Sequence, residues 1–239
     1  MIKNKRGSAL IWILVILILI GVGIGAYIIF TNPASEKGAR ALGKRLNKPV
    51  HFLPLCFRPQ DIKEADQQLC EFLGTERMDT SELEKESTVL VKEIREIMTG
   101  WKAVIDYTAT SRPFNLARYL VENGIDVSKV YLDAVASSDK EDFAWLKENR
   151  ANTVLASPTN PAARFFHEDD HQSKNVLAIG QKAAYYEGTS NFVNMVEGGN
   201  YQGFSGLLSL LKDMKDAILK EKNVSSIIQI KGWGCNCAK

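Results

Sequence analysis

Cys235 and Cys237, near the carboxyl terminus, form the pattern in this sequence that most directly suggests chemistry. Thiolates one residue apart can share a metal ion or one edge of an iron–sulfur cluster. Two ligands do not close such a site, so further ligands would have to come from elsewhere. A redox pair, or a tail without a chemical role, fits the same pattern. We take the two cysteines as candidate metal ligands.

The other cysteines and a pair of histidines suggest weaker metal sites. Cys56 follows the first predicted strand and could be a third ligand, although a small buried apolar residue is the simpler interpretation. Cys70 falls on the apolar face of a predicted helix, which indicates a core residue. His167 and His171 stand four residues apart, a spacing that can place two imidazoles on one helical face. Their polar, proline-containing surroundings favour a solvated loop instead.

Acidic and small polar residues follow several predicted strands. Asp106 and Asp133 end two of them, and Glu197 follows a third. The carboxyl ends of parallel strands meet at one edge of a sheet, where ligands of such folds bind. Loops rich in Ser, Thr and Gly can hold anionic groups there on backbone N–H donors, although each loop singly is more simply explained as a helix cap. The residues predicted to bind a cofactor are Thr108, Ser111, Glu197, Gly198, Gly199 and Tyr201.

Short apolar runs alternate with amphipathic segments from residue 49 onward. The expected strands are residues 50–55, 102–106, 129–133, 153–156, 175–179 and 192–196. The expected helices are residues 60–73, 81–98, 115–123, 140–148 and 203–222. This alternation indicates an α/β fold, a doubly wound, Rossmann-like parallel sheet with helices on both faces. Ser81 with Glu84 fits a capping box, and Ser111 and Ser138 are expected to cap the helices that follow them.

The amino-terminal part has the features of a membrane anchor. Residues 8–30 carry no charge, and 23 residues at about 1.5 Å each span the roughly 30 Å hydrocarbon core of a bilayer. We predict an uncleaved single-pass transmembrane helix after a basic segment, residues 1–7, and before a polar linker, residues 31–48, whose middle is compatible with a helix. A pilin-like leader cut after Gly7 is the alternative, although the glutamate usual in such leaders is absent. Lys and Arg are slightly more numerous after the span, which favours a cytoplasmic location for residues 49–239.

The composition excludes several classes of protein. A formal net charge of +2 and the lack of a basic run give no indication of nucleic-acid binding. Four cysteines in 239 residues are too few for a disulfide scaffold. Neither GxGxxG nor GxxxxGK[ST] occurs, so nucleotide binding has no motif support. The part after the linker is long enough for one domain with a substantial core.

Several segments between residues 38 and 239 resemble the carboxyl-terminal part of nitrogenase component 1 type proteins. They are LGKRLNKPVHFLPL at 42–55, LAIGQKAAYY at 177–186, NFVNMVEGGNYQGF at 191–204, Gly206, and Asp213 with Met214. In that family a strand leads to a Gly-rich turn, an aromatic-x-Gly-aromatic element and the last long helix. Residues 139–146 and 231–237 are similar to a nitrogenase-like branch of the family. The resemblance implies the carboxyl-terminal, Rossmann-like sub-domain of that family.

The resemblance also implies partners and cofactors. It implies a paired homologous subunit or a homo-oligomer, iron–sulfur clusters held between subunits, and electron delivery from an ATP-dependent iron–sulfur reductase. The family's cluster cysteines lie in a region that the membrane span and linker replace here, and its cofactor-ligating histidine corresponds to Val193. No family metal ligand is therefore carried over to this chain, and dinitrogen reduction is not expected.

Three hypotheses follow for the function. The first is a membrane-anchored, truncated nitrogenase component 1-like oxidoreductase subunit that depends on an iron–sulfur cluster and a partner chain. The second is a non-catalytic binding or scaffold module that keeps the fold without the cluster ligands. The third is a gene fragment or fusion whose domain does not fold well alone, because a sheet cut from a larger subunit exposes apolar surface. The substrate cannot be inferred from the sequence.

Overall fold

The structure is a computed structural model that describes residues 28–30, 36–159, 175–199 and 201–222. The chain divides into two compact units. The smaller unit comprises Met1–Pro54 and Lys63–Met78, and the larger comprises Leu55–Ile62 and Asp79–Lys239. The candidate functional residues that the structure describes belong to the larger unit.

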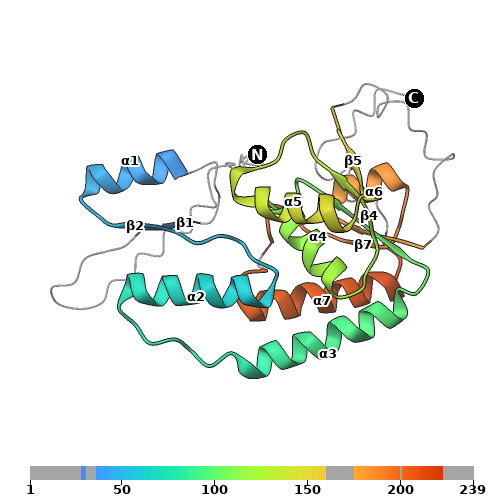
Figure 1. The fold of residues 1–239 in the computed structure, drawn as a ribbon, viewed down its shortest axis with the longest axis horizontal. Helices are drawn as coiled ribbons and strands as arrows, with labels where there is room; N and C mark the ends of the chain where they lie inside the picture. The colour runs from blue at the N-terminus through green and yellow to red at the C-terminus, as the bar shows by residue number, and fades with distance from the viewer. Residues whose placement is uncertain (1–27, 31–35, 160–174, 200, 223–239) are drawn as a thin grey trace, which may run out of the picture. The chain divides into compact units, whose positions relative to one another are not determined.

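A five-stranded parallel sheet forms the centre of the larger unit (Figure 1). Its strands are β3 (Lys102–Asp106), β4 (Val127–Tyr131), β5 (Val154–Ala156), β6 (Val176–Ile179) and β7 (Phe192–Val193). The strand order is β5-β4-β3-β6-β7, so the chain builds the sheet outward from β3 first in one direction and then in the other. The doubly wound, Rossmann-like α/β fold expected from the sequence is confirmed.

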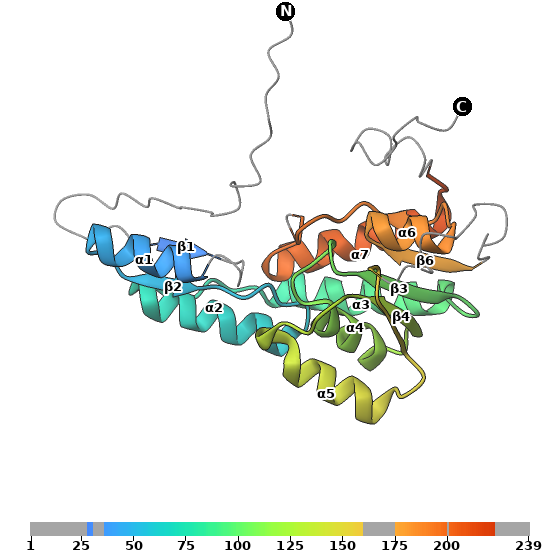
Figure 2. The ribbon, with the colours of Figure 1, turned by 90° about the horizontal axis from the view of Figure 1, so that it is seen from above.

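Helices cover both faces of this sheet, as such winding requires. They are α3 (Ser81–Ile97), α4 (Pro113–Glu122), α5 (Lys140–Asn149), α6 (Gln181–Glu187) and α7 (Gly203–Leu219). Figure 2 shows α4 and α5 on one side of the strands and α6 on the other. Helix α7 packs on β6 and β7, and α3 packs along α7.

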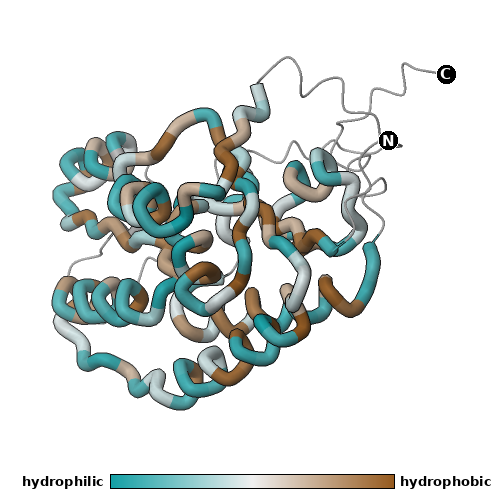
Figure 3. The backbone as a smooth tube through the Cα atoms, turned by 45° about the vertical axis from the view of Figure 1, so that its right-hand side comes forward, coloured by the Kyte–Doolittle hydropathy of each residue, from teal (hydrophilic) through white to brown (hydrophobic). Residues whose placement is uncertain are grey.

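The core of the larger unit lies where the central strands meet these helices. Residues 103–105 of β3 and 177–179 of β6 are at most 1% exposed. Helix α7 buries Leu207, Leu210, Leu211 and Met214 completely, a spacing of three and four residues that places them on one helical face. The alternation of brown and teal along the helices in Figure 3 follows this division between buried and exposed positions.

Some elements differ from the expected ones. Strand β4 begins two residues earlier than expected, because buried Val127 pairs with Ala103 while the polar Ser128 and Lys129 hide the strand in the sequence. Strand β7 has only two residues, and the chain turns immediately afterwards, where Met195 N–H donates to the Val193 carbonyl. Helix α6 has seven residues, too few to show a clear period, and was not expected.

The expected helix caps are wrong. Helix α3 has Thr80 rather than Ser81 at its N-cap, without a side-chain cap, and Asp79 Oδ1 accepts the Ser81 N–H at 2.9 Å. Thr80 has φ −112° and ψ 13°, outside the extended conformation that side-chain capping requires. Helix α4 has Arg112 at its N-cap, and a carboxylate from a distant segment replaces the expected Ser111 cap. Ser138 lies in a 3-10 turn before α5 and does not cap it either.

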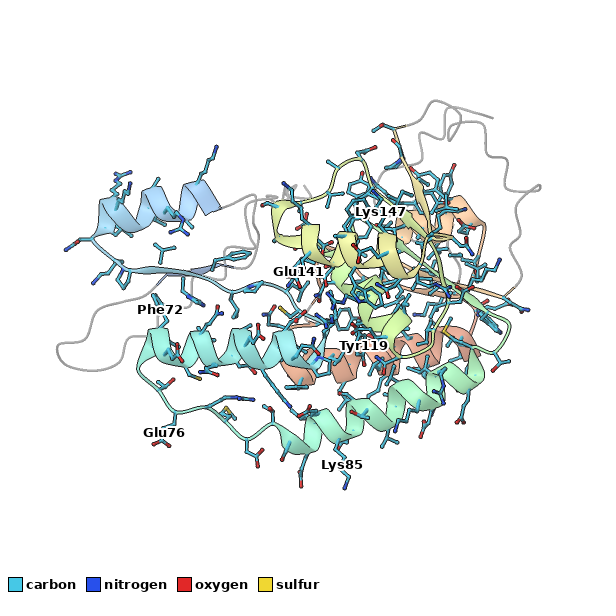
Figure 4. The ribbon with its side chains drawn as sticks, in the orientation of Figure 1. Phe72, Glu76, Lys85, Tyr119, Glu141 and Lys147 are labelled. Atoms are coloured by element: carbon cyan, nitrogen blue, oxygen red, sulfur yellow. The ribbon has the colours of Figure 1, made fainter. Side chains whose placement is uncertain are left out.

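The smaller unit contains a two-stranded parallel sheet of β1 (Ile28–Phe30) and β2 (Val50–Phe52), helix α1 (Glu36–Leu46), and most of α2 (Pro59–Leu73). The His51 ring stacks on the Phe72 ring with centroids 4.9 Å apart, and Figure 4 shows the Phe72 side chain directed from α2 toward β2. Helix α1 lies inside the predicted linker, residues 31–48. The sequence of the middle of that linker was compatible with a helix.

The predicted transmembrane helix lies almost entirely outside the described residues. Its last three residues, Ile28–Phe30, form strand β1 instead, because they pair with β2. None of the helices in the described ranges combines the length and apolar character that crossing a bilayer requires. The anchor at residues 8–27 stays a prediction.

Candidate functional site

The order of the strands marks one place in the larger unit for a ligand. The direction of winding reverses between β3 and β6, so the loops after these two strands leave toward opposite faces of the sheet. In open α/β sheets the crevice between two such loops is where ligands bind. Here the loops are residues 107–112 after β3 and the turn at Gly180 after β6. We refer to this place as the switch-point site.

Asp106, the last residue of β3, organises both loops. It is completely buried. Its Oδ1 accepts hydrogen bonds from Thr108 N at 2.8 Å, Thr108 Oγ1 at 2.5 Å and Ala109 N at 3.1 Å. Its Oδ2 accepts one from Ala183 N, in the first turn of α6, at 2.8 Å. Because both carboxylate oxygens are used in these bonds, Asp106 braces the site rather than facing a ligand.

The turn at Gly180 accepts only glycine. Its φ of +112° is a conformation that residues with a Cβ rarely adopt. A Cβ added there would lie 2.1 Å from Asp106 Oδ2. The close approach of the turn to the carboxylate therefore fixes the residue type at this position.

The glycine-rich turn after β7 joins the same site through its backbone. Glu197 N–H donates to the Thr108 carbonyl at 2.7 Å, and Gly198 N–H donates to the Ala109 carbonyl at 2.6 Å. Glu197 itself has a φ of +50°. The structure thus brings together Thr108, Glu197 and Gly198, which the sequence placed at one sheet edge. Their N–H groups are engaged within the chain, so they hold the loops together instead of pointing at a ligand.

The other predicted cofactor residues lie around this turn. The Gly199 α-carbon lies against the Tyr201 ring, so a Cβ at Gly199 would come within 2.9 Å of that ring. Tyr201 Oη donates to Asp213 Oδ2 at 2.5 Å, and burial together with this carboxylate raises the pKa of the phenol. Ser111 lies half-buried in the loop after β3. A cofactor role for these residues stays a prediction.

The outer rim of the switch-point site carries groups that can meet a ligand. Lys182 Nζ donates to Tyr107 Oη and lies 4.4 Å from the Tyr107 ring centroid. Exposed Asp133, two residues after β4, accepts from Ser157 Oγ at 2.6 Å and Thr159 Oγ1 at 2.9 Å. These hydrogen bonds, with a smaller contribution from Lys182, lower the pKa of Asp133. The rim therefore combines a cation, a phenol, hydroxyls and a carboxylate, which suits a small polar ligand.

Neither Tyr107 nor Lys182 was among the residues predicted from the sequence to bind a ligand. Their signal is positional, because Tyr107 directly follows β3 and Lys182 lies three residues after β6, the two strands between which the winding reverses. Tyr185 is 48% exposed, whereas Phe204 is buried in α7 and cannot contact a ligand in this arrangement.

A buried ionic cluster holds the end of the loop after β3 through Arg112. Arg112 donates to Asp142 Oδ2 at 3.0 Å and to the Leu55 carbonyl at 3.4 Å, and its Nε lies 3.7 Å from Asp139 Oδ1. Asn115 Nδ2 donates to the same Asp142 oxygen at 2.9 Å. Arg118 Nη1 also donates to Asp142 Oδ1, at 3.1 Å. Two carboxylates and two guanidinium groups therefore meet in this cluster, and the position of the loop depends on their charges.

Asp139 supplies the N-terminal cap of α4 that Ser111 does not. Its two oxygens accept from Phe114 N at 2.7 Å and Asn115 N at 3.0 Å. Burial raises the pKa of Asp139 to about 7, although these N–H donors and Arg112 oppose the shift.

The raised pKa of Asp139 predicts a pH dependence of stability. Because the ordinary value is 3.8 and the folded value is about 7, the native state holds this proton more tightly between those pH values. The stabilisation is fully present below pH 3.8 and is lost as pH rises through 7. We expect the unfolding free energy of the wild type, minus that of Asp139→Asn, to fall across this window. Chemical denaturation at a series of pH values measures it, and a constant difference would contradict the assignment.

The described residues do not fit an iron–sulfur cluster by themselves. Burial raises the pKa of the Cys56 thiol to about 11, and its Sγ accepts a hydrogen bond from Arg112 at 3.1 Å. Cys70 is half-buried in the smaller unit, and its Sγ lies 3.7 Å from the Glu76 carbonyl oxygen. Across the described part of the chain, no three His, Cys, Asp or Glu side chains gather as a metal site would require. Cys235, Cys237, His167 and His171 lie outside the described residues.

Comparisons with known proteins support the fold. The chain is similar to a solved structure titled "Nitrogenase Cp1 at pH 6.5", with a TM-score of 0.53 and 19% sequence identity. The likeness covers 85% of this chain but 46% of that one, so this chain spans about half the length of the solved protein. No protein-family model and no curated protein matches the sequence. The chain thus has a nitrogenase-like fold. Val193, which the resemblance in sequence aligned with that family's histidine ligand, is buried in β7.

Proposed function

We propose that this chain is a membrane-anchored subunit of a nitrogenase-like oxidoreductase, in which Cys235 and Cys237 hold an iron–sulfur cluster together with ligands from a partner chain. The partner is a homologous subunit or a second copy, and an ATP-dependent iron–sulfur reductase supplies the electrons. The soluble part lies on the cytoplasmic side of the membrane. Dinitrogen is not the expected substrate.

The likeness of fold is the observation that carries this proposal. It extends over 85% of this chain and 46% of the solved protein. Cys56 has a raised pKa and contacts Arg112, which leaves Cys235 and Cys237 as the better candidates for thiolate ligands. Because two thiolates do not complete a cluster, a partner chain has to contribute ligands.

The switch-point site supports a role in binding. Asp106 holds the loops after β3 and β6 in one arrangement, so the rim groups Lys182 and Tyr107 are presented from a fixed scaffold. Lys182 can hold an anionic group of a ligand, and exposed Asp133 can accept its hydroxyl or amine protons. Binding at this rim needs no cluster.

A non-catalytic binding module is the second candidate. The engaged N–H groups of Thr108, Ala109 and Gly198, together with the unsuitable Cys56, favour it. In this case the fold and the rim act without redox chemistry, and the partner binds without bringing a cluster.

Iron and acid-labile sulfide content distinguishes the two candidates. The full chain, purified without oxygen in a non-ionic detergent together with its partner chain, is expected to contain both in stoichiometric amounts. Cys235→Ser with Cys237→Ser is expected to lose them, because serine does not replace a thiolate ligand. Cys70→Ser is the matched control, since that thiol is half-buried and not assigned to a cluster. A folded, metal-free wild type would overturn the redox proposal and favour the binding module.

A further inference from the structure

Residues 55–62 are held on the larger unit by polar side chains on and next to α4. The segment belongs to the larger unit, although the chain on either side of it belongs to the smaller one. Asn115 on α4 bonds to it twice: its Oδ1 accepts from Phe57 N at 2.9 Å, and its Nδ2 donates to Asp61 Oδ2 at 2.6 Å. This attachment therefore determines how firmly the chain is held where it enters the larger unit and returns to the smaller one.

Charged side chains complete this attachment, and we call them the ionic clamp. Its members are Arg58, Asp61, Arg112, Arg118, Glu122, Asp139 and Asp142. Arg58 in the segment donates to Asp61 at 3.1 Å and to Glu122 on α4 at 3.0 Å. Arg118 donates to Glu122 at 2.9 Å and to Asp142 at 3.1 Å. With four carboxylates and three guanidinium groups, the charges of the clamp balance only when one carboxylate holds a proton.

Asp139 is the carboxylate of the clamp whose surroundings most favour the protonated form. It is 1% exposed. The other three carboxylates each accept a guanidinium hydrogen bond of 3.1 Å or less. By contrast, Arg112 Nε lies 3.7 Å from Asp139 Oδ1, beyond hydrogen-bond distance. Burial raises the pKa of Asp139 to about 7, in agreement with this geometry.

The other groups that face Asp139 come from α4 and α5. Two backbone N–H groups at the start of α4 donate to its oxygens and favour its charged form, as Arg112 does. The charge of Asp142 on α5 favours the neutral form. Glu141 lies 3.8 Å from Arg118, but its side chain is 93% exposed and therefore screened by water. Burial outweighs the donors, so Asp139 loses its proton near neutral pH rather than in acid.

Arg112 can respond to the charge of Asp139. Its Nε is buried and has no hydrogen-bond partner within the described residues. Its Nη1 donates to the Leu55 carbonyl at 3.4 Å and to Cys56 Sγ at 3.1 Å, so the same guanidinium holds the start of the segment. An ionised Asp139 attracts Nε across the 3.7 Å gap. Because the guanidinium is rigid and planar, a move of Nε toward Asp139 displaces Nη1 from its two acceptors.

We propose that Asp139 is a proton switch for the attachment of residues 55–62 to the larger unit. With Asp139 protonated, the charges of the clamp balance and Arg112 holds the start of the segment. Loss of the proton leaves one excess negative charge, Arg112 turns to Asp139, and the segment opens more often. The segment is therefore held more firmly at mildly acidic than at mildly alkaline pH. The switch needs neither an iron–sulfur cluster nor the membrane anchor.

Hydrogen–deuterium exchange of the full chain in a non-ionic detergent, measured by mass spectrometry, tests this switch. The peptide with the Phe57 amide reports opening of the segment, and a peptide from residues 207–214 of α7 reports unfolding of the core. Each rate is divided by the intrinsic exchange rate at the same pH. Because the open form carries an ionised Asp139 and the closed form titrates near pH 7, we expect the opening equilibrium to rise about 10-fold from about pH 6 to about pH 8.

Asp139→Asn is expected to remove this pH dependence, because asparagine does not titrate. Since that change also removes one acceptor of the α4 cap, Asp142→Asn is a second variant. It removes a charge that raises the pKa of Asp139, so we expect the rise in exchange to move to lower pH. Glu148→Gln removes a charge from an exposed position on α5 and should leave the profile unchanged.

Two results would overturn the proposal. The first is a segment whose corrected exchange does not change with pH, or changes equally in the wild type and in Asp139→Asn. The second is equal protection of the segment and of α7 at every pH, because the segment would then open only when the whole larger unit unfolds.

Discussion

Asp106→Ala is expected to destabilise the protein by about 3–5 kcal/mol, because it leaves several buried donors without an acceptor. Thr108 N, Ala109 N and Ala183 N all lose their partner, and the Thr108 hydroxyl loses its own. The loops after β3 and β6 would then no longer be held together. Urea denaturation monitored by circular dichroism measures the loss.

Asp133→Ala is the matched control for this change. It lies two residues after the neighbouring strand β4, and its carboxylate is exposed and contacts hydroxyls at the surface. We expect a change within about 0.5 kcal/mol. An Asp106→Ala variant as stable as Asp133→Ala would show that the carboxylate does not brace the site.

Arg112→Met is expected to cost about 2–3 kcal/mol, because it removes one of the two guanidinium groups that neutralise a buried pair of carboxylates. Buried Asp142 loses its 3.0 Å partner Arg112 but keeps Arg118 at 3.1 Å, and Asp139 loses a nearby positive charge. Arg95→Met makes the same exchange at an exposed position on α3 and should change stability by less than about 1 kcal/mol.

A second substitution separates charge from packing in this cluster. Arg112→Met combined with Asp142→Leu removes the cation together with its closest carboxylate. We expect the double variant to be more stable than the sum of the two single changes predicts, by about 1–3 kcal/mol. Additive losses would mean that the two groups act independently, which their 3.0 Å separation contradicts.

The sheet and its order could be predicted because buried parallel strands leave a strong local signal. Residues 103–105 and 177–179 are short apolar runs bounded by polar residues, and the structure buries both. Strand β4 was misplaced by two residues because Ser128 and Lys129 interrupt its apolar pattern. Helix α6 was missed for a related reason, since two turns are too short to display a helical period.

The clustering of the site could be predicted only in outline. That Thr108, Glu197 and Gly198 share one sheet edge follows from parallel topology alone. The enclosure of Asp106 by backbone donors from two loops could not be predicted. One of these donors, Ala183 N, lies 77 residues later in the sequence, and no local pattern indicates such a contact. The Asp139 cap of α4 was missed likewise, because a nearby serine offers the same chemistry in the sequence and the acceptor comes from 25 residues away.

The partners of buried charged residues could not be predicted from the sequence either. Glu187 is buried and accepts from Lys129 Nζ at 2.5 Å and from Tyr131 Oη at 2.6 Å. The two donors lie on β4, more than 50 residues earlier in the chain. In the sequence these residues look like solvated positions, and only the packing of α6 against the sheet makes them partners.

The central claim, an iron–sulfur cluster that depends on Cys235 and Cys237, is tested most directly by the visible and electron paramagnetic resonance spectra of the full chain. The protein is purified without oxygen together with its partner chain and examined before and after reduction by dithionite. We predict a broad visible absorption that bleaches on reduction, a paramagnetic signal in one of the two states, and the loss of both in Cys235→Ser with Cys237→Ser. A colourless wild type with a cooperative unfolding transition and no signal in either state would contradict the claim.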